Sequence, residues 1–293
     1  MKKIIVTGAN GQVGTAVRQL AAAFPQFQIM GIDRRELDIT QPHRINGLFR
    51  RESFDYCINA AAYTAVDRAE TEAEAAHEVN VTGAKNIAEA CNLLQIPMIH
   101  LSTDYVYDGI DAKPILETDQ VNPVGVYAKT KLEGELEAQR HHDQVMVVRT
   151  SWVYAAFGHN FLKTMLRLGQ ERESLSVVYD QIGSPTYAMD LAKALLHIIH
   201  QVEAGKVDRI ALHNETYHYS NEGVASWYDF AKLIFDTQKV NCKLNPILSS
   251  EYPTPAKRPA FSLMDKQKIK RTFALEIPNW MDSVRTCLRS MPL

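Results

Sequence analysis

The N-terminal segment carries the pattern that most constrains the fold of this chain. A short β-branched run at residues 4–6 is followed by Gly8, Gly11 and Gly14, and apolar residues then recur at helical spacing through residues 12–24. A strand, a glycine turn and a helix in this order are typical of dinucleotide binding. The glycines let the backbone approach a pyrophosphate, and the first N–H groups of the helix point at it. We therefore expect a nucleotide cofactor at this turn.

The end of the second predicted strand, residues 29–33, bears on the choice of cofactor. Asp33 lies about twenty residues beyond the glycines, where an acid usually accepts hydrogen bonds from ribose hydroxyls and favours NAD. Arg34 and Arg35 follow and could hold a 2′-phosphate, which favours NADP. A solvated turn is the alternative role for the two arginines. The signals conflict, so the choice stays open, with NADP(H) favoured and NAD(H) retained.

Three further predicted strands deliver small or polar side chains to one edge of a sheet. These strands are residues 54–59, 98–103 and 145–150. The side chains that follow or end them are Ala60, Ala61 and Ala62, then Ser102, Thr103 and Asp104, then Ser151 and Trp152. Ligands collect at the carboxyl ends of strands in open α/β sheets. Small residues there let a flat cofactor lie against the backbone, and hydroxyls can share the developing charge of a carbonyl oxygen.

Tyr127 and Lys131 form a candidate acid–base pair. Their spacing of four places both side chains on one face of a helix, one turn apart. An ammonium about 5 Å from a phenol, at an effective dielectric near 20, favours the phenolate by roughly 3 kcal/mol and lowers the phenol pKa by about two units. We therefore expect Tyr127 to protonate a carbonyl as hydride arrives. Tyr228 and Lys232 share the spacing, but their segment is typical of an ordinary amphipathic helix, so we interpret them as structural.

These motifs together resemble the extended short-chain dehydrogenase/reductase superfamily and, more narrowly, the dTDP-4-dehydrorhamnose reductases. The closer match lies in residues 37–40, 59–70, 102–109, 149–154, 180–186 and 254–259, which span nearly the whole chain in the family's order. Tyr107 stands where the family more usually has phenylalanine. The resemblance implies reduction of dTDP-4-dehydro-L-rhamnose by NAD(P)H. The product would be dTDP-L-rhamnose, a precursor of surface polysaccharide, made in the last step of its biosynthesis.

The resemblance also implies a role for each site residue. Thr103 and Tyr127 would bind the C4 carbonyl, with Tyr127 giving the proton, and Lys131 would hold the nicotinamide ribose and tune Tyr127. Asp104 and Trp152 would contact the sugar ring. The expected cofactor groove comprises Gly8, Asn10, Gly11, Gln12, Val13, Asp33, Arg34, Asp38, Ile39, Ala60, Ala61, Ala62, Tyr63, Thr64, Tyr127 and Lys131.

Arg258 is the remaining candidate for substrate binding. It lies between prolines in residues 253–259, and proline stiffens a loop. A guanidinium held there could grip the diphosphate of a nucleotide sugar. A surface turn with incidental charge is the alternative interpretation.

The residue after Asp104 separates reduction from elimination. Nucleotide-sugar dehydratases need an additional acid–base carboxylate beside this position, and the chain has Tyr105 there. Simple carbonyl reduction is therefore the consistent interpretation. A 4-epimerase is excluded less firmly, since it also uses a Tyr–Lys pair. Reduction of another 4-keto nucleotide sugar and a non-catalytic regulatory subunit of this fold remain alternative hypotheses.

The chain is long enough for a large core, with 293 residues of which 46% are hydrophobic. Strands alternating with helical patterns predict an α/β fold with a doubly wound, Rossmann-like parallel sheet. We expect residues 1–150 to form an NAD(P)-binding domain. Residues 151–293 should form mainly a smaller substrate-binding lobe, interleaved with Rossmann elements such as residues 187–200.

Composition limits the partners that we expect. A net charge of −2 gives no indication of nucleic acid or of an acidic membrane surface. The four cysteines lack disulfide or metal spacing, and His197 with His200 lacks an evident third ligand, so we predict no metal. Neither a signal peptide nor a long apolar stretch is evident, and we expect a cytoplasmic protein. The expected partner is a nucleotide-sugar substrate, with a homodimer as an open possibility.

Overall fold

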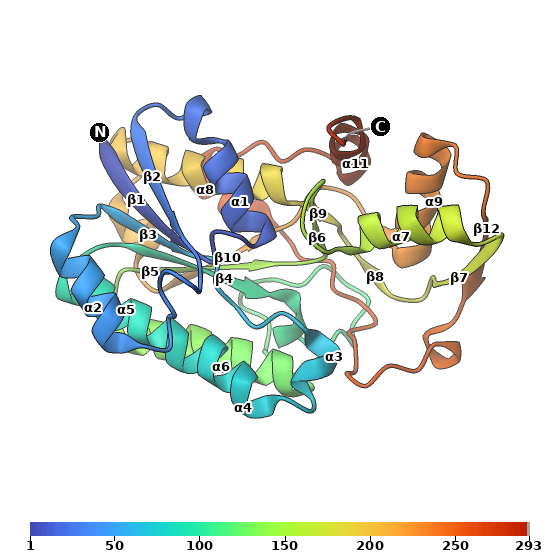
Figure 1. Ribbon diagram of the computed structural model, residues 1–293, viewed down its shortest axis with the longest axis horizontal. Helices are drawn as coiled ribbons and strands as arrows, with labels where there is room; N and C mark the ends of the chain where they lie inside the picture. Colours follow the sequence, from blue (N-terminus) through green and yellow to red (C-terminus); the bar gives the residue numbers. More distant parts are fainter. Residues whose placement is uncertain (292–293) are drawn as a thin grey trace.

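A six-stranded parallel sheet forms the centre of the computed structural model, which describes residues 1–291 (Figure 1). All neighbouring strands run parallel. The order reverses at the first strand of the chain, since the second and third strands lie on opposite sides of it. This confirms the predicted doubly wound sheet and places the ligand crevice at the carboxyl ends of the strands. From edge to edge the strands are β2 (Phe27–Ile32), β1 (Lys2–Thr7), β3 (Tyr56–Asn59), β4 (Met98–Thr103), β5 (Val145–Thr150) and β10 (Glu215–Tyr219).

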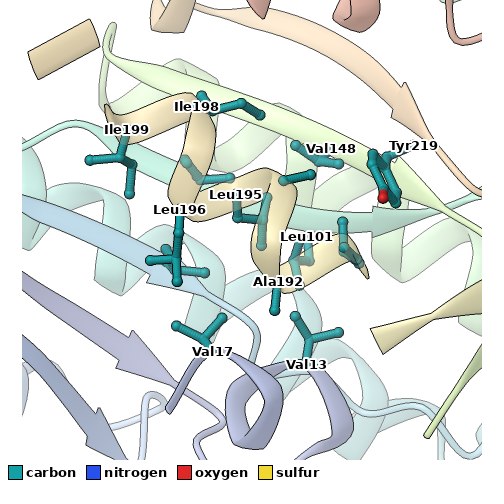
Figure 2. Packing of buried hydrophobic residues seen from close by; sticks show 14 of the residues in the cluster. Val13, Val17, Leu101, Val148, Ala192, Leu195, Leu196, Ile198, Ile199 and Tyr219 are labelled. Atoms are coloured by element: carbon teal, nitrogen blue, oxygen red, sulfur yellow. The ribbon is translucent and has the colours of Figure 1, made fainter. Parts of the chain in front are cut away.

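Helices cover both faces of the sheet, because strand side chains point alternately to the two faces. Ile4 and Val6 of β1 share one buried cluster with α1 (Gln12–Gln19) and α8 (Ala188–Glu203). Ile5 belongs to the cluster on the opposite face. Figure 2 shows side chains of α1 and α8 packed together over the sheet. The helices of the opposite face are α2 (Pro42–Arg51), α5 (Gly83–Leu93) and α6 (Val126–His141) (Figure 1).

The first helix is shorter than predicted, whereas β4 and β5 have the predicted bounds. The helix expected through residue 24 ends at Gln19, and a 3₁₀ turn at Ala21–Ala23 follows. Phe24 precedes Pro25. A proline ring disfavours helical backbone at the residue before it, so the 3₁₀ turn ends before Phe24 and the chain turns into β2.

β10 is absent from the predicted strands, because polar side chains interrupt its apolar pattern. His218 in this strand is fully buried. Its Nε2 lies 2.8 Å from Tyr107 Oη, and its Nδ1 lies 3.2 Å from the Asp265 carbonyl oxygen. These partners are distant in the sequence, so no local pattern reveals that a polar residue in this segment can be buried.

A further hydrophobic cluster lies beyond the carboxyl edge of the sheet, at the right of Figure 1. We call the helices and strands that pack around this cluster the lobe. Its helices are α7 (Phe161–Glu171), α9 (Trp227–Gln238) and α11 (Trp280–Arg289). Its strands pair as β7 (Ser174–Val178) with β12 (Lys243–Ile247), β6 (Val153–Tyr154) with β9 (Thr186–Tyr187), and β8 (Ile182–Gly183) with β11 (Ala225–Ser226). Between these elements of the lobe, α8 and β10 return to the sheet. The domain boundary near residue 150 stays a prediction.

Short helical segments complete the described chain. α3 (Val66–Ala69), α4 (Ala73–His77) and a π-helical turn at Glu78–Thr82 connect β3 to α5, and α10 (Gln267–Phe273) packs against β10. The other 3₁₀ turns are Asp104–Val106, Arg209–Leu212 and Ser249–Glu251. None of the helices in residues 1–291 combines the length and apolar character needed to span a bilayer.

Candidate active site

One cavity of about 700 Å³ lies at the carboxyl edge of the sheet and brings most of the predicted site residues together. The glycine turn and the Tyr–Lys pair therefore face the same space. Asp33 and Arg258 do not line this cavity. The predicted residues that do are Gly8, Asn10, Gly11, Gln12, Val13, Arg34, Asp38, Ile39, Ala60, Ala61, Ala62, Tyr63, Thr64, Thr103, Asp104, Tyr127, Lys131 and Trp152.

The glycine turn lies against the end of β3 so closely that side chains are excluded. Gly8 has a φ of +65°, and a Cβ added to it would lie 2.6 Å from the Ala60 carbonyl oxygen. A Cβ on Gly14 would lie 2.3 Å from the Gly8 carbonyl oxygen. Both positions therefore require glycine, and α1 begins directly after Gly11. This is the cradle that a pyrophosphate needs at a helix N-terminus.

The groups at the end of β2 are arranged so that an arginine, and not Asp33, faces the cavity. The Asp33 carboxylate accepts hydrogen bonds from Asn10 Nδ2 at 2.5 Å and from the N–H groups of Arg35 and Glu36. These bonds, first of all the one from Glu36, lower the pKa of Asp33. Arg34 Nε lies 3.5 Å from Asp38 Oδ2, and both residues line the cavity.

Asn80, which the sequence analysis misses, holds the inner part of the groove. It lies in the π-helical turn, and its Oδ1 accepts from the Tyr63 N–H at 2.8 Å. Its Nδ2 donates to Thr130 Oγ1 at 3.1 Å, and that hydroxyl donates to the Tyr127 carbonyl. π-Helical turns are frequent at functional sites. Asn80 thus couples the loop after β3 to the helix that carries the Tyr–Lys pair, through contacts that no local spacing signals.

The predicted catalytic set comes together at the junction of β4 and α6. Thr103 ends β4, and Tyr127 and Lys131 lie in the first turns of α6. The Tyr127 ring contacts Tyr105 edge to face, with centroids 5.5 Å apart. Lys131 is buried, and its Nζ donates to the Leu101 carbonyl oxygen at 2.7 Å. All of these side chains line the cavity.

The pKa of Tyr127 differs from the prediction. Burial raises it to about 12, with the Thr103 hydroxyl opposing this rise and Asp104 adding to it. Burial also lowers the pKa of Lys131 to about 8, against the attraction of Glu135. The expected lowering of the phenol pKa by Lys131 is therefore wrong in this structure. The reason is that burial disfavours the phenolate, while the ammonium donates to a backbone carbonyl. A phenol with this pKa keeps its proton at neutral pH, as a proton donor must.

A buried ion pair lies one turn beyond Lys131 on α6. Glu135 accepts from Arg149 Nε at 3.0 Å and from a terminal nitrogen of the same guanidinium at 2.6 Å. Arg149 also donates to Tyr107 Oη at 2.6 Å, and that hydroxyl contacts His218. Burial lowers the pKa of His218 to about 3, so this histidine is neutral. The network gives Tyr107 a polar partner on each side.

Asp104 and Trp152 both line the cavity, and Trp152 also packs against the hydrophobic cluster of the lobe. Asp104 is 2% exposed, and its Oδ2 has no hydrogen-bond partner among residues 1–291. Burial raises its pKa to about 6, with Ser262 and Thr103 opposing the rise. Trp152 has a φ of +47° and stacks on Trp227 with ring centroids 3.7 Å apart. An unpaired carboxylate oxygen and an indole ring in the same cavity are suited to a sugar hydroxyl and a sugar ring.

Arg258 lies beside the cavity rather than in it. Its guanidinium pairs with Asp67 at 2.8 Å, and Asp67 also accepts from the Ala256 N–H. A small pocket next to this pair includes Arg258 and Tyr105, and Tyr105 also lines the main cavity. The arginine is therefore one side chain away from the catalytic space.

Several lining residues lie outside the predicted set: Leu37, Val66, Val79, Leu101, Thr150, Val153, Gly158 and His159. Gln12 connects two of their segments, because its Nε2 donates to the Val153 carbonyl at 3.1 Å and its Oε1 accepts from Asn160. Gly158 and His159 belong to the loop that these bonds hold beside the glycine turn. Only the tertiary fold brings these positions together, since most are ordinary apolar or loop residues in the sequence.

The side chains that the sequence predicts to be neither catalytic nor metal-binding lie outside the cavity. Tyr228 lies on α9 and is absent from its lining, and Lys232 forms an exposed pair with Asp236. His197 contacts the Phe273 carbonyl and Gln201. Across residues 1–291, no three His, Cys, Asp or Glu side chains are grouped as a metal site would require.

Comparison with known proteins gives consistent results over the whole chain. A family model described as the RmlD substrate binding domain matches residues 1–292. The dTDP-4-dehydrorhamnose reductase of Aggregatibacter actinomycetemcomitans is 40% identical over 291 residues, covering 97% of this chain and 98% of the relative. A crystal structure of a dTDP-4-dehydrorhamnose reductase from Clostridium acetobutylicum has a TM-score of 0.91 at 36% identity, covering 98% of each chain. The reductase of Bacillus anthracis in complex with NADP has a TM-score of 0.92 at 35% identity, covering 99% of this chain and 100% of the other.

Proposed function

This chain belongs to the dTDP-4-dehydrorhamnose reductase family, and on that premise we propose that it reduces dTDP-4-dehydro-L-rhamnose at C4 with NADPH. The observation that carries the proposal is that Thr103, Tyr127 and Lys131 line the same cavity as the glycine turn. A carbonyl reductase needs a proton donor and a hydride source on the same reacting carbon.

The chain's own residues fit the cofactor. The turn at Gly8 and Gly14 excludes side chains where a pyrophosphate would approach the N-terminus of α1. Arg34 faces the cavity, whereas the Asp33 oxygens are occupied by hydrogen bonds. A guanidinium in this place favours a 2′-phosphate, so we assign NADPH. When bound, NADPH supplies the hydride that C4 receives.

Tyr127 acts as the proton donor in the proposed reaction. As hydride adds to C4, the carbonyl π electrons move to O4, and Tyr127 transfers its proton there. The Thr103 hydroxyl donates a hydrogen bond to the same oxygen and stabilises its developing charge. Burial keeps the phenol protonated beforehand, because its pKa is about 12. Lys131, with a pKa of about 8, is mostly an ammonium at neutral pH and would hold the nicotinamide ribose.

The end of the cavity next to the lobe would hold the sugar nucleotide. Asp104 Oδ2 would accept from a sugar hydroxyl, since it has no partner among residues 1–291. Trp152 would form one wall for the ring. A substrate diphosphate that reaches the small pocket would compete with Asp67 for Arg258. We therefore propose that residues 1–150 bind the cofactor and that residues 151–293 bind mainly the substrate.

The cellular setting and the assembly are further parts of the proposal. A cytoplasmic location would place the protein where NADPH and nucleotide sugars are made, and it is the setting that we propose. We propose a homodimer as the assembly. Sedimentation velocity at several protein concentrations distinguishes a dimer from a monomer. A monomer at every concentration would contradict the proposed dimer.

Turnover of the purified protein tests the function. NADPH mixed with dTDP-4-dehydro-L-rhamnose should lose the absorbance of reduced nicotinamide. Tyr127→Phe should lower kcat by about a hundredfold or more while keeping NADPH affinity, because the ring remains and only the proton donor is lost. Lys131→Met should weaken both catalysis and NADPH binding.

The chain supplies matched controls at the same spacing. Tyr228→Phe and Lys232→Met change the same residue types on α9, outside the cavity, and should leave kcat unchanged. Turnover of another 4-keto nucleotide sugar, with none of this one, would discard the proposed substrate. Full activity of Tyr127→Phe would discard the proposed donor.

A further inference from the structure

Trp152 has a backbone conformation that residues other than glycine rarely adopt. Its φ of +47° lies in the left-handed region, which is strained for a residue other than glycine. The residue lies two positions beyond the end of β5 and lines the cavity. Other contacts must therefore hold this residue in place, because an unsupported chain would relax to ordinary backbone angles.

Trp227, the first residue of α9, covers one face of that indole. The two ring centroids lie 3.7 Å apart, and the planes differ by 11°. Trp227 does not line the cavity itself. Its Nε1 donates to Gln181 Oε1 at 3.1 Å, and the Phe161 ring lies 4.7 Å from it. The second indole is thus fixed by the lobe and can affect the cavity only through the first.

Gly183, the last residue of β8, lies against the ring of Trp152. A Cβ added there would approach Cε2 and Cζ2 of the Trp152 ring to 3.0 Å and Ser262 Oγ to 2.8 Å. The absence of a side chain at Gly183 therefore allows the indole to lie where it does. Trp227 and Gly183, 44 positions apart by their residue numbers, meet at the same ring.

We propose that Trp227 and Gly183 are positioning residues that clamp the Trp152 indole in its sugar-facing orientation and so set affinity for the sugar. The inference rests on the proposed function, because it takes Trp152 as a wall of the sugar site. Neither residue needs to touch substrate or cofactor. The clamp should therefore act on sugar binding and leave the cofactor groove and proton donor unaffected.

Substitution of Trp227 separates this role from a merely structural one. Trp227→Ala should raise the KM for the sugar about tenfold, the size that loss of one aromatic pair can give, with kcat and the KM for NADPH nearly unchanged. Trp227→Phe should restore most of the affinity, since it keeps a stacked ring. Gly183→Ala should also raise the sugar KM, because the added methyl crowds the indole and the Ser262 hydroxyl. Trp280→Phe, in the same lobe core, is the control and should leave both KM values unchanged.

Circular dichroism supplies a second readout, because two stacked indoles give a coupled signal of opposite signs. The unaltered protein and Trp280→Phe should show it, whereas Trp227→Ala and Trp227→Phe should lack it. An unchanged sugar KM in Trp227→Ala after loss of the signal would overturn the clamp, and so would an unaltered protein without the signal. If Trp227→Ala does not fold, Gly183→Ala decides, and an unchanged sugar KM in it overturns the inference. Failure of the unaltered protein to reduce the sugar would instead contradict the proposed function.

Discussion

Asp104→Asn should stabilise the folded protein at neutral pH while damaging sugar binding. The Asp104 carboxyl is 2% exposed, and Oδ2 lacks a partner among residues 1–291. Burial raises its pKa from the ordinary 3.8 to about 6. The charged form is therefore kept in a place that disfavours it, a condition that functional sites often maintain at the expense of stability.

The magnitude follows from the difference between the two pKa values. A shift of about two units corresponds to about 3 kcal/mol between the protonation states. Between about pH 4 and pH 6 the folded chain retains a proton that the unfolded chain has released, so stability falls as the pH rises through this window. The full penalty is present above the folded pKa of about 6. An amide cannot ionise, so the variant should avoid this penalty of about 3 kcal/mol at most.

Urea unfolding at about pH 8 and about pH 4 tests this reasoning. Asp104→Asn should unfold at higher urea than the unaltered protein at the higher pH, and the advantage should vanish at the lower pH. Asp111→Asn is the matched control, since Asp111 is 76% exposed and should change little at either pH. Equal midpoints at about pH 8, or an advantage that persists unchanged near pH 4, would refute the account of the Asp104 charge.

Two further predictions concern the ion pair and the cofactor. Glu135→Gln should lower the free energy of unfolding by about 3–5 kcal/mol, because it leaves the buried Arg149 guanidinium without its carboxylate. Urea melts should show no such loss for the control Glu171→Gln, whose pair with Arg167 is exposed, and a loss below about 1 kcal/mol in Glu135→Gln would contradict the prediction. Arg34→Ala should raise the Kd for NADPH about tenfold and leave that for NADH nearly unchanged, as measured by fluorescence titration. An equal loss of affinity for NADPH and NADH would show that Arg34 does not recognise the 2′-phosphate.

The central sheet was largely predictable from the sequence because its strands carry strong local signals. Buried parallel strands are rich in apolar residues: residues 145–148 form a continuous apolar run, and β4 contributes Met98, Ile99 and Leu101. Glu215–Tyr219 lacks such a signal, and its buried His218 depends on Tyr107 and on a distant carbonyl. A strand stabilised by tertiary hydrogen bonds cannot be recognised from hydrophobic pattern alone.

The candidate site was predictable to the extent that it depends on short spacings. The glycine turn joins a strand and a helix that are consecutive in the sequence, and Tyr127 and Lys131 lie within one helix, so the sequence indicates which groups face together. Their electrostatics depend on burial by the whole fold, which is why the expected direction of the Tyr127 pKa was wrong. Asn80 was missed for a related reason, because its three hydrogen bonds join segments that only the folded chain brings together.

Transfer of deuterium tests the central claim most directly. NADPH that carries deuterium at the transferable position of the nicotinamide would be mixed with the protein and dTDP-4-dehydro-L-rhamnose, and the product examined by NMR and mass spectrometry. The account predicts dTDP-L-rhamnose with deuterium at C4, formed by the unaltered protein and by Tyr228→Phe, and nearly absent with Tyr127→Phe. Unchanged sugar, or a product without deuterium at C4, would contradict the assignment of this cavity to carbonyl reduction.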